Sequence, residues 1–491
     1  MRSAWSPLLR VAIALVLAQG LARFIDKARD FLASPWSRDY GEGCVLAMVQ
    51  LLAERGSYFP DMRDYPLVHG NYPPVFIALN WPLYAFFGPS LFFPRLLSLL
   101  STALLLGALF FLLVRLLDDR LTAAFLSLSF LTPWFVQTWA ALGRVDMLAC
   151  LLSLLGLLFW ERDREQAGWR RYRAFPLFWL AFFTKQNALL APAAVLLHAW
   201  LEDRRELRRA LPAFLLPLLA LLGLLVAVTG GLAFRHLVTY TAAAEYEWPR
   251  MVESYGEFAL ITWPAQALIV AGLVLASRGV LAGPGRAFVF YWLLNLLALA
   301  TIAKAGAAQN YFIEPWLATL LVTGIALRAL GERFPAALAW SPACVLVVVL
   351  AASYARWEAN RLPQAIRSPE RALDFAALTQ AIRETEGPIL SENLSLLVVN
   401  GKRVLVEPFG FLQLTGRGYL RPDRVVRDCE RGFFALVITE HRLREVPGLA
   451  ECLDRRYYAW KDLGPYQALR PVIEPGGAAS YPPDPPLAPP K

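Results

Sequence analysis

The sequence is poor in charged residues and in the residues that usually hold metal ions. Only 18% of its 491 residues are charged, and it has four histidines and five cysteines. These histidines and cysteines show no zinc-ligand spacing, and the chain has no glycine-rich phosphate loop and no serine nucleophile elbow. The absences argue against a zinc enzyme, a P-loop enzyme and an α/β-hydrolase. An internal repeat, which many transporters show, is also missing.

Long apolar runs are what the chain has in abundance. It is 57% hydrophobic, whereas soluble domains average about 45–50% apolar residues. Runs such as "LLSLLSTALLLGALFFLLVRLL" are long enough to cross a bilayer, and only a helix satisfies the backbone there. We therefore expect an α-helical polytopic membrane protein with about 11 spans, centred near Leu15, Leu105, Leu128, Leu154, Leu180, Val195, Leu218, Val270, Leu294, Val322 and Val347.

The distribution of positive charge predicts the orientation of these spans. The net charge of +9 suggests a nucleic-acid partner, but the basic residues gather in short loops between apolar runs, at 162–173, 204–209, 278–286 and 328–333. This is the positive-inside pattern, so these loops are predicted to be cytoplasmic and no nucleic-acid partner is expected. The N-terminus is interpreted as an uncleaved first span that starts in the cytoplasm. The segment "PPVFIALNWPLYAFFG" is interpreted as interfacial.

The composition changes after about Tyr354. We predict a membrane domain at 1–354, a small α/β domain outside the cytoplasm at 355–475, and a disordered proline-rich tail at 476–491. Within the α/β domain, "SPERALDFAALTQAIRETEG" predicts a helix, and "GPILSEN", "KRVLVEP" and "FALVITE" predict buried strands. Cys429 and Cys452 could pair if this domain lies in an oxidising space, but their spacing alone does not show it.

Two acids, Asp39 and Glu42, stand at the start of an apolar run in the motif "RDYGEG". Asp at a helix N-cap with Glu three residues later is a variant of the capping box. A carboxylate fixed at a helix start is equally suited to act as a general base. The sequence leaves both interpretations open, and they are compatible with each other.

Other ionisable and polar residues recur at the predicted outer ends of spans, where such residues are costly and are functional candidates. They are Tyr72 in "NYPP", Arg144 and Asp146 in "GRVD", Lys185 in "TKQN", and Lys304, Asn310, Tyr311 and Glu314 in "AKAGAAQNYFIE". Each also has an ordinary explanation. Arg144 and Asp146 can form a local ion pair, Lys185 can extend its side chain to the interface, and the last group can anchor a helix at the interface.

The order of these motifs on one membrane face resembles the bacterial membrane glycosyltransferases of the GT-C superfamily. The resemblance covers about residues 3–354 and is closest to the family 39-like enzymes that carry an RgtA-type domain. Their relatives include protein O-mannosyltransferases and lipid A aminoarabinose transferases. Asn310, Tyr311 and Glu314 match the family's Asn-Tyr-x-x-Glu signature. The family often has two adjacent acids in the first outer loop, whereas here Tyr-Gly separates Asp39 from Glu42.

The resemblance implies an inverting transfer of a sugar from a polyprenyl-phosphate donor to an envelope acceptor outside the cytoplasmic membrane. Asp39 takes the role of the general base, with Glu42 as the second catalytic acid. Arg144, Lys185 and Lys304 take the role of binding the lipid phosphate. No cofactor is required, and a divalent cation bridging Asp39 and Glu42 is an open alternative. The competing functions are a polysaccharide polymerase or ligase, and a transporter or lipid flippase.

Overall fold

The structure is a computed structural model that describes residues 7–166, 168–334, 344–350 and 369–472, with side chains from 374 onward in the last segment. The chain clusters into two units, each built from three separate segments. The first unit comprises Met1–Phe31, Leu96–Leu221 and Tyr246–Leu362. The second comprises Leu32–Arg95, Leu222–Glu245 and Pro363–Lys491. The sequence predicted a boundary near residue 354, and the second unit additionally contains two segments from earlier in the chain.

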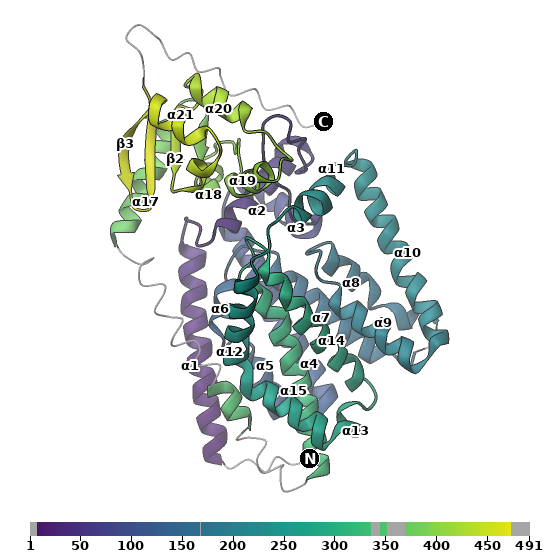
Figure 1. The fold of residues 1–491 in the computed structure, drawn as a ribbon. Coiled ribbons are helices and arrows are strands. Elements are labelled where there is room, and N and C mark those ends of the chain that lie inside the picture. The colour runs from purple at the N-terminus through teal and green to yellow at the C-terminus, as the bar shows by residue number, and fades with distance from the viewer. Residues whose placement is uncertain (1–6, 167, 335–343, 351–368, 473–491) are drawn as a thin grey trace. The chain divides into compact units, whose positions relative to one another are not determined.

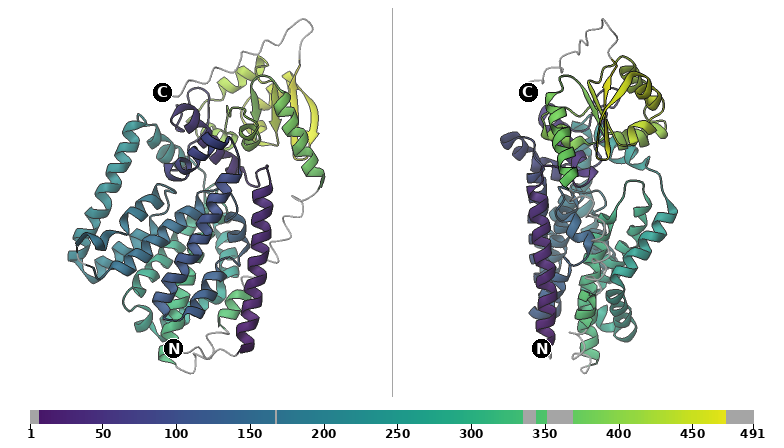
Figure 2. Two further views of the ribbon diagram at one scale, coloured as in Figure 1. Left: turned by 180° about the vertical axis from the view of Figure 1, so that it is seen from behind. Right: turned by 90° about the vertical axis from the view of Figure 1, so that its left-hand side faces the viewer.

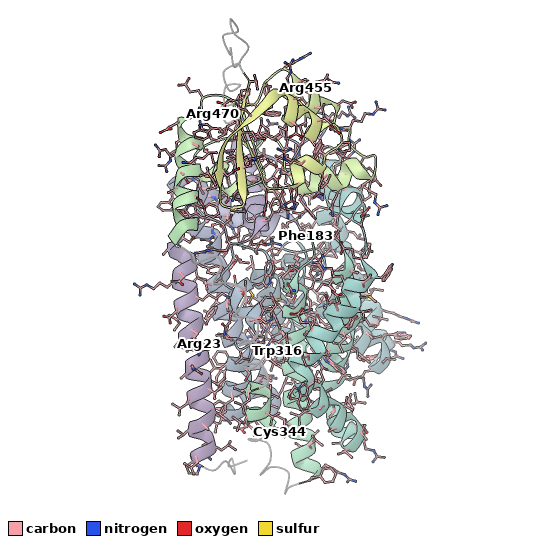
Figure 3. The ribbon with its side chains drawn as sticks, turned by 60° about the vertical axis from the view of Figure 1, so that its left-hand side comes forward. Arg23, Phe183, Trp316, Cys344, Arg455 and Arg470 are labelled. Carbon is pink, nitrogen blue, oxygen red and sulfur yellow. A yellow bond between two sulfur atoms is a disulfide. The ribbon has the colours of Figure 1, made fainter. Side chains whose placement is uncertain are left out.

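Within the described residues, six helices are long and apolar enough to cross a membrane, which confirms a polytopic helical membrane protein (Figure 1). They are α1 (Pro7–Ala33), α4 (Phe92–Leu117), α10 (Arg204–Val228), α12 (Trp248–Leu275), α14 (Gly285–Ala298) continued by η3 (Leu299–Ala303), and η4 (Gln309–Phe312) continued by α15 (Ile313–Arg333). Helix α15 is buried over most of its length, and Trp316 lies inside the packed helices (Figure 3). The first unit is therefore organised around α15.

Shorter helices account for the remaining predicted spans of the first unit. They are α5 (Arg120–Ser129), α6 (Trp134–Trp139), α7 (Asp146–Asp163), η1 (Gly168–Tyr172), α8 (Phe175–Phe182), α9 (Leu190–Glu202) and α13 (Ser277–Val280). The predicted span centres all lie in helical residues, including the helical segment 344–350. Helices α5, α8 and α9 are shorter than the roughly 20 residues needed to cross the hydrocarbon core. The helical character of the predicted spans is thus confirmed, while the count of 11 stays a prediction.

The second unit begins with the first predicted outer loop. It contains α2 (Tyr40–Arg55), α3 (Pro74–Phe87), α11 (Leu232–Phe234) and η2 (Arg235–Tyr240). Helix α2 ends at Gly56, whose φ of 69° is the left-handed conformation that favours glycine at a helix C-terminus. Helix α3 has 14 residues and begins at Pro74, which suits the first helical turn because the missing N–H needs no partner there. This length agrees with an interfacial segment.

A four-stranded sheet and several helices form the C-terminal part of the second unit. The strands β1 (Ile389–Ser391), β2 (Leu436–Thr439), β4 (Tyr466–Pro471) and β3 (Tyr457–Leu463) lie in the order β1-β2-β4-β3. The first pair is parallel and the other two pairs are antiparallel. The helices are α17 (Pro369–Glu384), α18 (Leu394–Val399), α19 (Pro408–Gly416), α20 (Asp423–Glu430), η7 (Arg442–Glu445) and α21 (Leu449–Arg456). In Figure 2 the sheet lies between α17 and the pair α20 and α21.

The predicted α/β character of this region is confirmed, with one wrong strand. The helix α17 and the strands β1 and β2 lie where the sequence placed them. The run "KRVLVEP" instead makes an isolated bridge between Val406 and Leu67. Val406 is nevertheless buried in the same apolar cluster as the sheet residues Leu390 and Val437, so its burial does not require a strand. The predicted disordered tail at 476–491 lies outside the described residues.

One apolar core joins the C-terminal part to the earlier segments of the second unit. Met62 and Leu67 from the first segment and Ala243 from the second segment pack in the same cluster as the strand residues Leu390 and Val437. Cys429 and Cys452 belong to this cluster and form a disulfide. This shared core explains why three distant stretches of sequence form one unit.

Candidate active site

Asp39 is the N-cap of helix α2. Its carboxylate Oδ2 accepts a hydrogen bond from the backbone N–H of Gly41 at 2.9 Å, and its backbone is extended. Glu42 stands in the first turn and accepts from the backbone N–H of Arg38 at 2.8 Å. The capping interpretation of "RDYGEG" is therefore confirmed. Because Asp39 is only half-buried, the cap is compatible with a chemical role for the same carboxylate.

Glu42 forms a fully buried ion pair with Arg95. Glu42 Oε1 lies 2.7 Å from Arg95 Nε, Glu42 Oε2 lies 2.8 Å from Arg95 Nη2, and both side chains are 0% exposed. Arg95 also donates to the backbone carbonyls of Ser34 and Trp36, at 2.7 and 2.8 Å. The pair thus ties the start of α2 to the loop before it. This geometry gives Glu42 a structural task, whereas its predicted catalytic role stays a prediction.

A cavity of about 210 Å³ lies beside Asp39, entirely within the second unit. Residues of the first loop form one part of its wall, and residues of the C-terminal α/β region form the other. The lining consists of Ser37, Arg38, Asp39, Tyr40, Gly43, Phe375, Glu392, Asn393, Leu394, Ser395, Glu440, Arg442 and Tyr466. The structure therefore places the candidate base in a polar cavity that two distant parts of the sequence build together.

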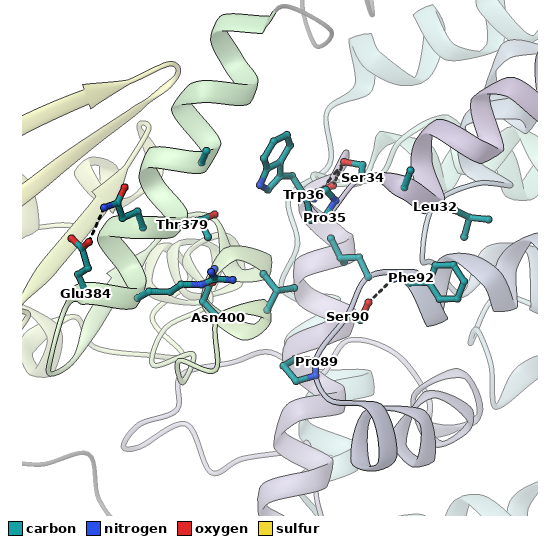
Figure 4. Close-up of a pocket in the computed structure, with 16 residues that line it drawn as sticks. Leu32, Ser34, Pro35, Trp36, Pro89, Ser90, Phe92, Thr379, Glu384 and Asn400 are labelled. Atoms are coloured by element: carbon teal, nitrogen blue, oxygen red, sulfur yellow. Dashed lines mark hydrogen bonds between the residues drawn. The ribbon is translucent and has the colours of Figure 1, made fainter.

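A second and larger cavity of about 750 Å³ is lined by adjacent residues of the same unit (Figure 4). Trp36 lines the larger cavity and Ser37 the smaller one, and Trp36 stacks on Phe375 with ring centroids 5.4 Å apart. One part of the larger cavity is apolar, with Leu32, Pro89 and Phe92 among its residues, whereas α17 contributes polar side chains such as Thr379 and Glu384. None of the candidate site residues from the sequence is in the lining of the larger cavity.

Tyr40, directly after Asp39, is held by the C-terminal region. Its hydroxyl donates to the carboxylate of Glu407 and accepts from the backbone N–H of Phe409 at 3.1 Å. Glu407 also caps α19 by accepting from the N–H of Gly410 at 2.8 Å. Burial raises the pKa of the Glu407 carboxyl. The guanidinium of Arg442 lies 4.6 Å from the centre of the Tyr40 ring, which is a cation–π contact.

In the first unit, four of the predicted site residues converge around Asp146. Lys185 Nζ lies 2.7 Å from Asp146 Oδ1, and Asn310 donates to the same oxygen at 2.8 Å. Arg144 Nε lies 3.9 Å from Asp146 Oδ2. Tyr311 completes the group because its ring centre lies 4.9 Å from Lys185 Nζ. Residues from three separate predicted span ends thus form one buried polar cluster, and the predicted Arg144–Asp146 ion pair is present.

Glu314 belongs to the same region of the first unit. The Tyr291 hydroxyl donates a hydrogen bond to Glu314 Oε1 at 2.9 Å. Glu314, Asp146, Lys185 and Asn310 all line a cavity of about 30 Å³, which has room for roughly one water molecule. The Asn-Tyr-x-x-Glu motif therefore supplies side chains to the polar cluster around Asp146.

Lys304 and Tyr72 have different surroundings. Lys304 pairs through its backbone with Tyr246, and burial lowers the pKa of its half-buried ammonium group. Among the residues that the structure describes, no carboxylate lies within ion-pair distance of Lys304. Tyr72 belongs to the second unit, and its backbone carbonyl accepts from the hydroxyl of Tyr58 at 3.0 Å. The predicted binding roles of both residues stay predictions.

His236 holds the first outer loop in place. Its Nδ1 accepts from the backbone N–H of Gly70 at 3.0 Å, and its Nε2 donates to the carbonyl of Pro60 at 2.8 Å. Nδ1 can accept only in the neutral ring, and burial lowers the pKa of His236 to about 4. His69 contacts the carbonyl of His236 at 2.9 Å. These contacts are structural, and they join the second segment of the unit to its first loop.

A cation bridging Asp39 and Glu42 fits this structure poorly. Both Glu42 oxygens already accept hydrogen bonds, from Arg95 and from the backbone of Arg38. Within the described ranges, the group of acidic and histidine side chains close enough to share an ion is Glu392, Glu440 and His441. Glu392 in that group caps η7 and accepts from Thr439 and Leu443, so its oxygens are engaged.

Sequence reasoning missed the residues that connect the first loop to the rest of the second unit. Arg95 had a signal, since it is a lone cation at the start of the apolar run "FFPRLLSLL". Glu407 and Arg442 had none, because their contacts with Tyr40 lie across more than three hundred residues of sequence. A pattern read along the chain cannot show such pairings.

Comparison with solved structures identifies the fold. No protein-family model matches the sequence, and no curated protein matches it either. The chain is similar to ArnT from Cupriavidus metallidurans bound to undecaprenyl phosphate, with a TM-score of 0.61 and 13% identity over 96% of this chain and 99% of that one. The apo structure of the same protein gives a TM-score of 0.61 and 13% identity over 94% and 98%. The likeness thus spans the helical part and the C-terminal α/β region, and the chain has the fold of the GT-C membrane glycosyltransferases.

Proposed function

We propose that this protein is a membrane glycosyltransferase that moves a sugar from a polyprenyl-phosphate donor to an acceptor of the cell envelope. The observation that carries the proposal is the likeness to ArnT over nearly the full length of both chains, together with the undecaprenyl phosphate bound in one of those structures. A fold can host several activities, so the residues must supply the rest of the argument.

The cluster around Asp146 supports a role in holding the donor's phosphate. Two cations, Arg144 and Lys185, contact the carboxylate of Asp146. Asn310 donates to the same carboxylate, and the Tyr311 ring contacts Lys185. When the bond between the anomeric carbon and the phosphate oxygen breaks, the leaving lipid phosphate gains negative charge. Preorganised cations stabilise that charge without reorganising at the moment of reaction. Lys304 is a further candidate for the same task.

The cap position of Asp39 supports its role as the general base. The hydrogen bond from the Gly41 N–H holds the Asp39 carboxylate rigidly at the edge of a polar cavity. In the proposed reaction Asp39 takes the proton of the acceptor hydroxyl, and the acceptor oxygen attacks the anomeric carbon opposite the phosphate. The new glycosidic bond forms as the carbon–oxygen bond to phosphate breaks, so the configuration inverts. Glu42 and Arg95 act as positioning residues that hold the start of α2.

The disulfide supports an outer location for the C-terminal region. Cys429 and Cys452 are bonded in the core of the second unit, and disulfides persist in oxidising compartments. Asp39 belongs to this same unit, because Tyr40 is bonded to Glu407. We therefore place Asp39 and the α/β region on the outer face of the bacterial cytoplasmic membrane.

The test is a comparison of envelope glycolipids, polysaccharides and glycoproteins with and without the gene. Mass spectrometry of the deleted strain is expected to show one glycoconjugate lighter by the mass of a single sugar, restored by the intact gene. An envelope that is unchanged in every glycoconjugate class would contradict the proposal. Binding of undecaprenyl phosphate by the purified protein is a second and independent measurement of the donor site.

A further inference from the structure

The cavity beside Asp39 contains polar groups for which the described part of the chain provides no partner. The Tyr466 hydroxyl accepts from Asn393 Nδ2 at 3.2 Å, and within the described residues its own proton makes no hydrogen bond. The Arg442 guanidinium lies over the Tyr40 and Phe409 rings, at 4.6 and 5.7 Å, and in the described part of the chain it makes no ion pair. Both side chains can therefore donate hydrogen bonds to a molecule in the cavity.

The same cavity offers an acceptor and aromatic faces. The carboxylate of Glu440 is exposed and makes no ion pair within the ranges that the structure describes. Tyr40 and Phe375 contribute ring surfaces to the lining. A ring face is electron-rich and attracts groups with a partial positive charge, such as the C–H groups of a sugar. The volume of about 210 Å³ corresponds to roughly seven water molecules, which is enough for a single pyranose ring.

The balance of charge in the lining distinguishes between classes of ligand. Arg38 and Arg442 are cationic, whereas Asp39, Glu392 and Glu440 are anionic. A phosphate or carboxylate ligand meets three carboxylates here, and a cationic ligand meets two guanidinium groups. A neutral ligand with several hydroxyl groups can hydrogen-bond to the guanidinium groups and to the carboxylates, because each hydroxyl both donates and accepts.

We infer that the cavity beside Asp39 is the acceptor subsite and binds the acceptor as a neutral sugar ring, with Tyr466 and Arg442 donating to its hydroxyl groups. This deepens the proposed function and rests on it, since it names the acceptor class for the same carboxylate. It also assigns a task to the α/β region, whose residues select the acceptor. Asp39 at the edge of the cavity then meets one hydroxyl of the bound ring.

The experiment measures binding of small probes to the full-length protein in detergent. The probes are methyl α- and β-glycosides of glucose, galactose and mannose, with inorganic phosphate and a threonine-containing peptide as representatives of other acceptor classes. Saturation-transfer NMR is expected to show at least one methyl glycoside bound. Tyr466→Phe and Arg442→Gln are each expected to weaken that binding about three- to tenfold, as the loss of one hydrogen bond does. Phe keeps the ring and the packing of β4.

Matched controls use exposed residues of the same unit. Tyr458→Phe on β3 removes a hydroxyl at a side chain that is 48% exposed, and Arg431→Gln removes an exposed guanidinium. Both are expected to bind the glycoside like the parent protein. Glycoside binding that is absent in the parent, or unchanged in both Tyr466→Phe and Arg442→Gln, overturns the inference. Binding of phosphate or of the peptide in place of the glycosides also overturns it, in favour of an anionic or a protein acceptor.

Undecaprenyl phosphate binding separates this inference from the proposed function. If the protein binds the lipid phosphate but no glycoside, only the neutral-sugar acceptor site is refuted. If it binds no lipid phosphate and the deleted strain has an unchanged envelope, the glycosyltransferase proposal itself fails. The Tyr466→Phe variant is expected to bind undecaprenyl phosphate like the parent, because its change lies in the acceptor subsite.

Discussion

Replacing Glu42 with Gln tests whether this acid is structural or chemical. The substitution keeps the size of the side chain but removes its charge, and it takes away the carboxylate that pairs with the fully buried guanidinium of Arg95. Removing one partner of a buried ion pair typically costs about 3–5 kcal/mol, because the remaining charge is buried and unpaired. Three hydrogen bonds to Glu42 are affected, two from Arg95 and one from the backbone of Arg38. We expect a large loss of stability at this single position.

Thermal melting of the purified protein in detergent measures this loss. The control is Glu332→Gln, which removes a similar carboxylate from an exposed pair with Arg328 at 2.8 Å. Exposed pairs contribute only about 0–1 kcal/mol, so the control should melt close to the parent. Our reasoning fails if Glu42→Gln melts like the parent and yet transfers no sugar. Glu42 would then act chemically, as the sequence resemblance implies.

Three further substitutions address the base, the donor site and the loop. Asp39→Asn keeps a good N-cap, so it should cost only about 0–1 kcal/mol of stability, while sugar transfer should fall about 10²–10⁴-fold; near-normal transfer would make Asp39 a cap alone. Lys185→Gln should weaken the binding of undecaprenyl phosphate and lower transfer, and an unchanged affinity would remove Lys185 from the donor site. His236, with its pKa lowered to about 4, stays neutral in the folded protein while the unfolded chain takes up a proton below about pH 6.5. The contribution of His236 to the free energy of unfolding, about 3 kcal/mol, is therefore fully present above pH 6.5 and is lost as the pH falls from about 6.5 to 4. Melting curves of His236→Gln should lack this part of the pH dependence.

The sequence predicted those features that depend on local pattern. Apolar runs located the helices, because the backbone N–H and C=O groups of a membrane span must be hydrogen-bonded within the span itself, and a helix makes these bonds within a single stretch of chain. The cap at Asp39 followed from its spacing to Glu42. The motif residues Arg144, Lys185 and Asn310 were recognised singly, as polar groups at span ends. Their convergence on Asp146 follows from the packing of the helices.

Other features were out of reach of the sequence for physical reasons. The number of crossings cannot be read from apolar runs, since α8 and α9 are apolar yet end within 8 and 13 residues. The strands β3 and β4 have mostly exposed or half-buried residues, so they lack the buried apolar pattern that identified β1 and β2. The short run before Glu407 has that pattern without being a strand: its backbone makes an isolated bridge to Leu67, while Val406 is buried in the same apolar cluster as Leu390 and Val437.

The discontinuity of the second unit has a consequence for biosynthesis. Tyr40 is bonded to Glu407, which follows it by 367 residues, and Leu67 pairs with Val406. At a synthesis rate of about 5–20 residues per second, Glu407 leaves the ribosome roughly 20–70 s after Tyr40. The loop that carries Asp39 must therefore wait until the intervening residues have been made before its partners exist. A chain that stops before residue 400 can insert its helices, yet it cannot complete the cavity beside Asp39, so the last segment to be made decides when the proposed active site first takes shape.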